Sequence, residues 1–414
     1  MKRLLFLFST LLLAALFVVS YWEDGTREWT AYQRRFLGSL NRDERRGLSG
    51  GIKQLIVSDL RRVDRCTTCH MAIDKPQLAL AKEPFTAHPG EYLTWHPPEK
   101  FGCTVCHGGQ GLATEVKAAH GEVKHWEEPL LRGELIQSSC AKCHGDVKAI
   151  DAYVPKLAQG IQLYTQLGCA GCHAVGGFGQ AVSIDLSDIG DKPWQLLDFT
   201  FVEGHPTLSQ WLQEHFKEPR KVTPGFRKEE LPAGEEEIYP SFMPSYGLRD
   251  EEARALTIYM LSLTQKNLPA KYVISPPPPE PAPAYASSVE AGRAVFHAYG
   301  CNGCHGMNGM GGRKNWNAQL GQEVPALVYV KTIYDREHLK ELIRAGRQPV
   351  PRLDTTRPRP PLYMPSWKDR LNDEELEHVV DYLFSLYEQV PRPPSAPSEI
   401  EAGAQLESAS KGGG

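Results

Sequence analysis

The sequence predicts a mainly α-helical chain in three parts: an N-terminal membrane helix, a short segment without an ordinary hydrophobic core, and two repeated helical domains. Three observations support this prediction. A long apolar run opens the chain, five copies of one cysteine–histidine motif follow, and the last two copies lie in stretches of similar sequence. The 414 residues carry 46 basic and 50 acidic side chains, a net charge of −4, which argues against a nucleic-acid-binding protein.

Residues 1–22 are predicted to be a transmembrane signal-anchor. Lys2 and Arg3 precede Leu4–Trp22, nineteen residues without a charge, and such a run spans about 28 Å as a helix. Val18 and Ser20 leave a cleavable signal open as the alternative, but the length of the run and the interfacial pair Tyr21–Trp22 favour retention. We therefore expect one anchor in the inner membrane, with the bulk of the chain in the periplasm.

Residues 23–62 are expected to form a juxtamembrane segment with an amphipathic helix over Arg27–Gly47. Its apolar side chains recur at helical spacing on one face: Trp29, Tyr32, Phe36 and Leu40. This face either docks a membrane partner or packs on the first haem groups or on lipid headgroups.

All ten cysteines fall in five Cys-x-x-Cys-His boxes, numbered 1 to 5 in chain order. The boxes contain Cys66, Cys69 and His70; Cys103, Cys106 and His107; Cys140, Cys143 and His144; Cys169, Cys172 and His173; and Cys301, Cys304 and His305. This motif is the attachment signature of c-type haem: two cysteines on one turn bond the vinyl groups, and the histidine binds the iron. One box alone fits a zinc half-site or a redox dithiol. Five boxes with no cysteine left over predict five covalently bound haem c groups.

Residues 63–152 hold the first three boxes. Cys66–His144 is only 79 residues long, too short to build an ordinary core around three prosthetic groups. We therefore expect the haem groups themselves to form the core of this trihaem segment, close enough for electrons to hop between them.

Residues 153–268 and 287–390 are two repeats of one domain with one haem each. Gly160 and Gly292 both stand nine residues before the first cysteine of their box, and Met-Pro-Ser-aromatic follows at Met243 and again at Met364. Each repeat ends in a helix with an acidic start, over Asp250–Leu263 and Asn372–Leu386, the second with a capping box. Between the repeats, residues 269–286 are proline-rich and predict a semi-rigid spacer that lets the last domain swing. Residues 391–414 are expected to be a disordered tail.

Methionine is the predicted sixth iron ligand in both repeats. Met243 and Met364 lie in corresponding loops just before the closing helices. His205 and His215 are alternatives in the first repeat, whereas Met260 belongs to the apolar stripe of a helix, and Met307 and Met310 lie too near His305.

Histidine is the predicted sixth ligand in the trihaem segment. Its single methionine, Met71, directly follows His70, and four spare histidines remain for three irons: His88, His96, His120 and His125. One of the four should be structural, and His88 is the weakest candidate. Methionine ligation raises the potential of a haem, so electrons should pass from the trihaem segment to the repeats.

The two repeats resemble class I cytochrome c domains, with Cys-x-x-Cys-His near a first helix, a Met-Pro loop and a closing helix. Trp211–Arg220 is similar to the monohaem subunits of haem–copper oxidases. Phe101–Gly111 together with Ala119–Trp126 resembles multihaem cytochromes that accompany membrane cytochrome b complexes. The resemblance implies a periplasmic electron-transfer subunit whose partners are integral quinol-oxidising or cytochrome b-type subunits and a downstream redox protein or terminal oxidase.

Other functions need features that the sequence does not favour. A reductase acting on nitrite or peroxide needs an iron with an open sixth site, whereas two methionines and four histidines can cap all five irons. A filament-forming cytochrome fits poorly with a membrane anchor. We therefore expect no catalytic residue and no enzymatic activity of the chain alone.

Overall fold

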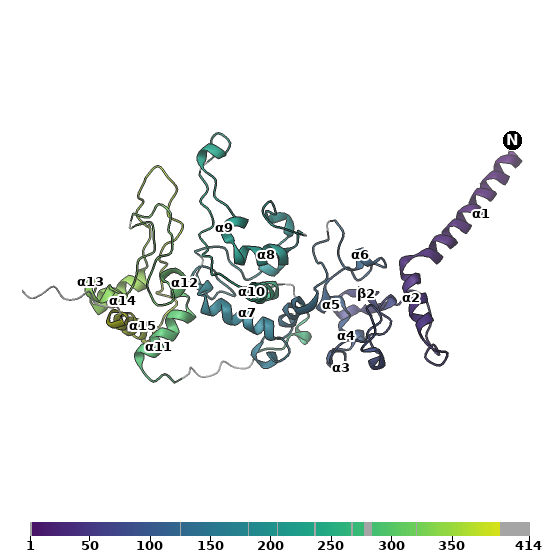
Figure 1. Ribbon diagram of the computed structural model, residues 1–414, viewed down its shortest axis with the longest axis horizontal. Coiled ribbons are helices and arrows are strands. Elements are labelled where there is room, and N and C mark those ends of the chain that lie inside the picture. Colours follow the sequence, from purple (N-terminus) through teal and green to yellow (C-terminus); the bar gives the residue numbers. More distant parts are fainter. Residues whose placement is uncertain are drawn as a thin grey trace, which may run out of the picture. The chain divides into compact units, whose positions relative to one another are not determined.

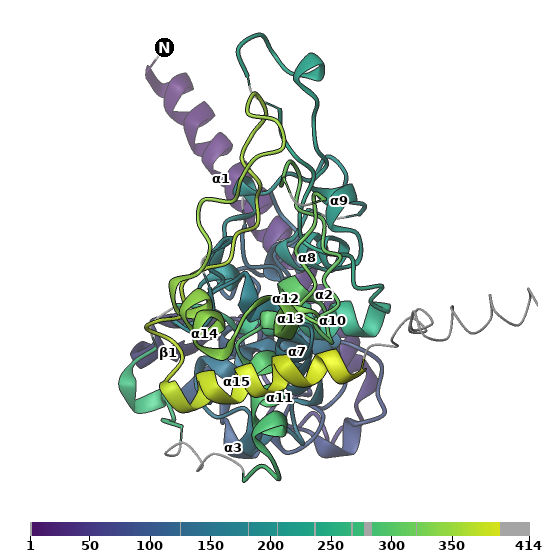
Figure 2. The same cartoon turned by 90° about the vertical axis from the view of Figure 1, so that its left-hand side faces the viewer.

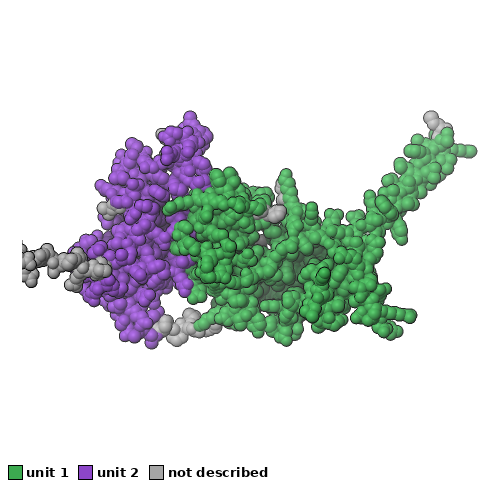
Figure 3. All heavy atoms as spheres, in the orientation of Figure 1, with its two compact units in different colours: residues 1–163, 186–223, 245–279 green, residues 164–185, 224–244, 280–414 purple. Residues whose placement is uncertain are grey.

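The computed structural model describes residues 2–124, 126–180, 182–204, 206–235, 237–265, 268–276, 284–319 and 321–389. It confirms the mainly α-helical prediction: in these residues helices and short 3₁₀ turns prevail, and one antiparallel pair of strands joins β1 (Leu55–Val57) to β2 (Arg62–Asp64) (Figure 1). The chain divides into two compact units (Figure 3). Unit 1 comprises residues 1–163, 186–223 and 245–279, and unit 2 comprises residues 164–185, 224–244 and 280–414.

Helix α1 spans Lys2–Thr26. Its stretch Lys2–Glu23 is long and apolar enough to cross a membrane, with a mean hydropathy of 2.4. None of that stretch is buried within the protein. Such a helix is compatible with a membrane anchor or with a signal sequence, and its retention stays a prediction.

Helix α2 spans Glu28–Ser39, so the expected helix over Arg27–Gly47 is wrong in its last part. Asn41 supplies the physical reason. Its side-chain oxygen accepts hydrogen bonds from the backbone N–H groups of Asp43 and Glu44, each 3.0 Å long. Local bonds of this kind compete with the continuation of a helix.

The apolar face of α2 is buried in unit 1. Phe36 is fully buried and Leu40 nearly so, and both pack on Met71 and Ala72, which directly follow box 1. The ring of Phe85 lies 5.3 Å from that of Phe36. The face thus packs on the protein segment that follows box 1, whereas the expected contacts with a membrane partner, with haem or with lipid headgroups stay predictions.

The trihaem segment consists of short elements joined by loops. They are β2, η2 (Cys66–Thr68), η3 (Pro76–Leu78), α3 (Tyr92–Trp95), α4 (Pro98–Phe101), α5 (Thr104–His107), α6 (Val116–Ala119), η4 (Gly133–Lys142) and η5 (Lys148–Ile150), with η1 (Ser58–Leu60) between the strands. Among its described residues the buried apolar side chains are Met71, Ala72, Ala87 and Val105. So small a set does not make a hydrophobic core, and the expectation that haem groups form the core of this segment stays a prediction.

The two repeats have matching first and last helices. The elements of the first repeat are α7 (Pro155–Gln166), η6 (Cys169–Gly171), η7 (Ile189–Asp191), η8 (Trp194–Leu196), α8 (Leu208–Lys217), α9 (Pro219–Val222), η9 (Lys228–Glu230) and α10 (Asp250–Ser262). Those of the second are α11 (Ser288–Ala298), α12 (Cys301–His305), α13 (Val330–Ile333), α14 (Arg336–Ala345), α15 (Asp373–Leu386) and η11 (Tyr387–Gln389). The first repeat contributes to both units, and its predicted boundaries stay a prediction.

The glycine shared by the repeats marks the point where the first and last helices touch. A Cβ atom at Gly160 would overlap the carbonyl oxygen of Ala255 in α10, and one at Gly292 would overlap that of His378 in α15. Figures 1 and 2 show α11 and α15 lying side by side. Glycine at these positions lets the two backbones approach closely enough to pack.

The closing helices confirm the predicted helix starts. At α15 the Asn372 side chain accepts from the Glu375 N–H at 2.8 Å, while the Glu375 carboxylate accepts from the Asn372 N–H at 3.0 Å, a complete capping box. Met260 is buried in α10, as expected of a core residue.

The first residues of the predicted linker bond to box 3 within unit 1. The N–H of Ile274 donates to the carbonyl oxygen of Cys143 at 2.7 Å, and the N–H of Gly145 donates to that of Ile274 at 3.1 Å. The turn η10 (Ala270–Tyr272) directly precedes this contact. Residues 277–283 of the linker and the predicted disordered tail, residues 391–414, lie outside the described residues.

Phe36→Ala tests the packing of α2 on box 1. Removing this fully buried ring should destabilise the trihaem segment by about 3–5 kcal/mol, because the surrounding side chains cannot close the cavity. Thermal melting of the haem-loaded protein, followed by circular dichroism, measures the loss. Arg34→Ala, at an exposed position of the same helix, is the control, and equal melting of both variants would contradict the packing.

Candidate functional site

Each box folds as one tight turn. In boxes 1 to 4 the histidine N–H donates to the carbonyl oxygen of the first cysteine, four residues earlier, at 2.9–3.0 Å. Box 5 is the helix α12 itself. The turn holds two sulfurs and one imidazole within a single helical turn, which is the arrangement that covalent haem attachment needs.

The first cysteines of boxes 4 and 5 are poor candidates for thiolate chemistry. Burial raises the pKa of Cys169 to about 12 and the pKa of Cys301 to about 12, whereas zinc ligation and thiol chemistry both use the thiolate. In contrast, a hydrogen bond from a neighbouring cysteine lowers the pKa of Cys66 and the pKa of Cys304. In the part of the chain that the structure describes, no cluster of three or more His, Cys, Asp or Glu side chains is arranged to hold a metal ion.

The box histidines of the two repeats are held in the orientation that suits an iron ligand. Nδ1 of His173 lies 2.8 Å from the carbonyl oxygen of Ile184, and Nδ1 of His305 lies 3.0 Å from that of Pro325. An Nδ1–H that donates to a carbonyl leaves Nε2 for a metal. Burial also lowers the pKa of both imidazoles, which favours the neutral form that binds metals.

In the trihaem segment each box histidine faces a second histidine from elsewhere in the chain. The ring centres are 6.5 Å apart for His70 and His120, 6.0 Å for His107 and His88, and 6.2 Å for His144 and His96. Two imidazoles on opposite sides of one metal have ring centres about 6 Å apart, since each metal–nitrogen bond is about 2 Å and each ring adds about 1 Å. All three separations match that value.

Three of the four spare histidines lie in these pairs. His88, which the sequence ranked last, faces box 2, while His96 faces box 3 and His120 faces box 1. His125 lies outside the described residues. Burial lowers the pKa of the His70, His107 and His144 imidazoles, as it does in the two repeats.

The predicted methionine ligands lie in unit 2 together with boxes 4 and 5. Met364 packs on the core formed by Phe296 and Trp367, and its carbonyl oxygen accepts from the Arg347 N–H at 2.7 Å. Met243 is half-buried in the loop before α10. Met243 and Met364 as iron ligands stay predictions.

Of the two histidines that are alternatives to Met243 as iron ligand in the first repeat, the structure describes one. His215 stacks on Trp211 within α8 at a ring separation of 4.5 Å and an interplanar angle of 11°. His205 lies outside the described residues.

Boxes 1, 2 and 3 are in contact within unit 1. The thiols of Cys66 and Cys103 share a hydrogen bond, which raises the pKa of Cys103. Lys142, inside box 3, donates from Nζ to the carbonyl oxygen of Val105, inside box 2, at 3.1 Å. The three attachment turns therefore form one continuous cluster.

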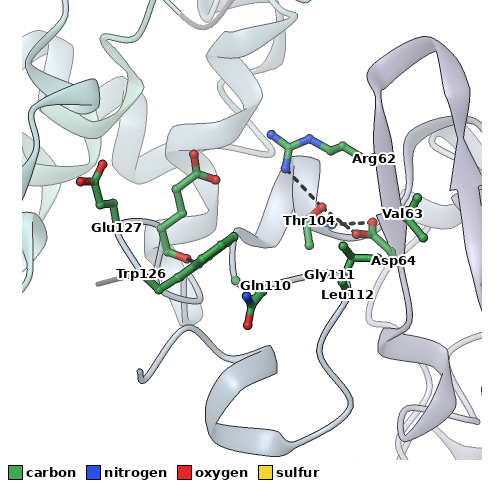
Figure 4. Close-up of a pocket in the computed structure, with 11 residues that line it drawn as sticks. Arg62, Val63, Asp64, Thr104, Gln110, Gly111, Leu112, Trp126 and Glu127 are labelled. Atoms are coloured by element: carbon green, nitrogen blue, oxygen red, sulfur yellow. Dashed lines mark hydrogen bonds between the residues drawn. The ribbon is translucent and has the colours of Figure 1, made fainter. Parts of the chain in front are cut away.

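Asp64 is a buried residue of this cluster that the sequence did not single out. Its carboxylate accepts from the backbone N–H groups of Cys103 and Thr104, at 2.5 and 2.9 Å, and from the Thr104 hydroxyl at 2.8 Å (Figure 4). These partners lie 39 and 40 residues away, so no local pattern could reveal them. The carboxylate anchors the start of box 2.

A cavity of about 490 Å³ opens beside Asp64. Its lining includes Arg62, Gln110, Trp126 and Glu127 (Figure 4), and it contains no cysteine or histidine of any box. The cavity flanks box 2, and Thr104 of that box is part of its lining.

Comparison with known proteins identifies the two repeats. A family model described as cytochrome c matches residues 157–264 and residues 289–387, together half of the chain. No curated protein and no solved structure matches.

His88→Ala, His96→Ala and His120→Ala test the three imidazole pairs. Each should convert one of the five irons from low spin to high spin and let it bind carbon monoxide, because one axial position loses its ligand. Electron paramagnetic resonance and optical spectra of the purified protein measure the change. His125→Ala and the exposed His338→Ala should leave the spectra unaltered, and a high-spin iron in His125→Ala would contradict the assignment.

Asp64→Asn tests the buried carboxylate. The substitution keeps the shape of the side chain but removes a negative charge beside boxes 1 and 2, so it should raise the potential of the nearest haem, since a buried anion favours the oxidised iron. A redox titration measures the shift. Asp74→Asn, at a carboxylate that is 73% exposed, is the matched control, and equal titrations of the two variants would refute the effect.

Proposed function

The chain belongs to the cytochrome c family, and on that premise we propose that it is a membrane-anchored, periplasmic pentahaem cytochrome that carries electrons from a quinol-oxidising membrane partner to a downstream acceptor. The two cytochrome c domains imply a haem protein of electron transfer. Each haem, when bound, supplies one-electron chemistry at its iron. The proposal adds the trihaem segment, a direction and two partners.

The three imidazole pairs carry the proposal. Six histidines from separate turns converge in pairs at 6.0–6.5 Å, the separation expected of ligands on one metal. The cysteines of the boxes by themselves support only the attachment of haem. The histidine pairs support, in addition, an axial ligand on each face of the iron. An iron capped on both faces is suited to accept and pass on an electron without binding a substrate.

The contacts between attachment turns support a continuous route through unit 1. The side chains of Cys66 in box 1 and Cys103 in box 2 are adjacent, and Lys142 of box 3 donates a hydrogen bond to the carbonyl oxygen of Val105 in box 2. The order along the route is therefore box 1, box 2 and box 3, which is also the order in the chain.

The axial ligands set the proposed direction. Histidine on both faces gives a lower potential than a histidine–methionine pair. Electrons should therefore enter the chain at the haem groups of boxes 1 to 3. They should leave it from the haem groups of boxes 4 and 5, for which Met243 and Met364 are the proposed ligands, toward a redox protein or a terminal oxidase.

The reductase alternative requires an iron with an open face. In unit 1 a histidine stands opposite the box histidine at each of the three boxes, so the alternative finds no support there. Carbon monoxide distinguishes the two functions, because five capped irons leave it unbound and a reductase binds it.

The membrane partner is proposed from the apolar helix α1 together with the resemblance of the trihaem segment to cytochromes that accompany cytochrome b complexes. Gentle solubilisation should recover the chain together with an integral quinol-oxidising subunit, and quinol added to that preparation should reduce the haem. A chain that purifies alone and is not reduced by quinol in its own membranes would rule out this partner.

Met243→His and Met364→His test the two groups of potentials. Each substitution should lower the potential of one haem by part of the roughly 0.8 V range that axial ligands span. The potentials of the other four haem groups should stay unchanged. A redox titration followed optically measures this. Met310→His, at a 62% exposed methionine near box 5, should shift none, and a titration of the native protein with five equal potentials would remove the proposed direction.

A further inference from the structure

Unit 2 joins the second repeat to two segments of the first, residues 164–185 and 224–244. The first segment carries box 4, and the second carries Met243. They are the two segments proposed to bind the iron of box 4. Both therefore associate with residues of the second repeat.

The attachment turns of boxes 4 and 5 pack directly on each other. Turn η6 contacts helix α12, and the contact is reciprocal: a Cβ at Gly171 would overlap the carbonyl oxygen of Gly300, and a Cβ at Gly303 would overlap that of Gly168. Gly171 and Gly303 do not have positive φ angles, so the backbone itself would accept a side chain. A side chain is excluded because the backbone of the facing attachment turn occupies the space that a Cβ atom would need.

The second cysteines of the two boxes meet in this contact. Sγ of Cys172 lies 3.7 Å from Sγ of Cys304, which is van der Waals contact between sulfurs. Thioether bonds to haem at both sulfurs would leave neither thiol free to form a disulfide.

A buried polar contact fixes the register of the two turns. Asn302, inside box 5, is fully buried, and its Nδ2 donates to the carbonyl oxygen of Gln166 in the first repeat at 2.9 Å. The corresponding position in box 4 is Ala170. Nearby, the ring of Phe178 lies 5.4 Å from that of Tyr299.

The Met243 loop is held by a separate set of contacts. The guanidinium of Arg357 in the second repeat donates to both carboxylate oxygens of Glu237, at 2.6 and 3.1 Å. The same guanidinium lies 5.5 Å from the ring centre of Tyr239, and that ring lies 6.4 Å from the ring of Trp316. Paired hydrogen bonds of this kind fix orientation as well as contact.

We propose that the second repeat holds both iron-ligating segments of the first repeat, so that boxes 4 and 5 form one fixed pair. The sulfurs of Cys172 and Cys304 lie in van der Waals contact within this pair. The inference rests on the proposed function, because it takes haem at both boxes and Met243 as a ligand. Electrons then pass between the two boxes directly, and the second repeat does not swing away from box 4 as the linker composition suggested.

A cleavable linker tests the fixed pair. A protease site replaces residues 277–283 of the full, haem-loaded chain, and the cut protein is passed over a gel-filtration column in detergent. We expect the two fragments to elute together from the otherwise native chain. Separate elution would overturn the proposal while leaving five capped irons, and hence the proposed function, intact.

Four variants of the cut protein locate the contact. Gly171→Ala and Gly303→Ala should make the fragments separate, because each adds one methyl group where the facing turn leaves no space. Gly38→Ala, at an open position of α2 without positive φ, should leave them together. If a glycine variant fails to load haem, Asn302→Ala tests the same contact. Fragments that stay together in all variants would refute the role of the turns.

Charge exchange tests the hold on the Met243 loop. Arg357→Glu and Glu237→Arg should each weaken the absorption band of methionine-ligated ferric haem to about half, since one of two such irons loses its ligand. The double exchange should restore the band. An unchanged band in both single variants would overturn this part of the proposal, whereas the complete absence of the band from the native protein would instead overturn methionine ligation.

Discussion

The pairing of six imidazoles is the constraint on which the proposed trihaem segment depends. The described residues of this segment bury four apolar side chains, so apolar contacts within the polypeptide contribute little to holding its loops together. Each proposed iron links a box to a histidine that lies far from it in the chain. The proposed links, with covalent bonds to cysteine, would take the place of a core, and they explain how a segment suffices whose elements, apart from the ten-residue η4, have only three or four residues.

The repeats rely on a different interaction, the close approach of backbone to backbone. Gly160 and Gly292 let the first and last helices of each repeat touch, and Gly171 and Gly303 let the two attachment turns touch. In each case a single methyl group would separate surfaces that now pack. Small residues thus determine both the fold of one repeat and its contact with the other.

Local patterns predicted much of this structure. The boxes, the closing helices, the capping box at Asn372 and the buried Met260 all depend on residues within a few positions of each other, and the structure has them as predicted. The end of α2 was wrong because the side-chain bonds of Asn41 outweighed the apolar periodicity. The partners of His88, His96 and His120, the role of Asp64 and the contact between boxes 4 and 5 all depend on residues brought together by the fold. One sequence alone carries no signal for such contacts.

The order in which the two histidines of each pair occur along the chain has a consequence for biogenesis. A polypeptide exported from its N-terminus delivers His88 before His107 and His96 before His144, whereas His70 emerges 50 residues ahead of His120. With the proposed ligands and the proposed export, the centre at box 2 is the first that secretion can complete, and the centre at box 1 must wait until the chain beyond box 2 has been translocated. A truncation between residues 107 and 120 would leave box 1 permanently half-built, although its own attachment motif is untouched.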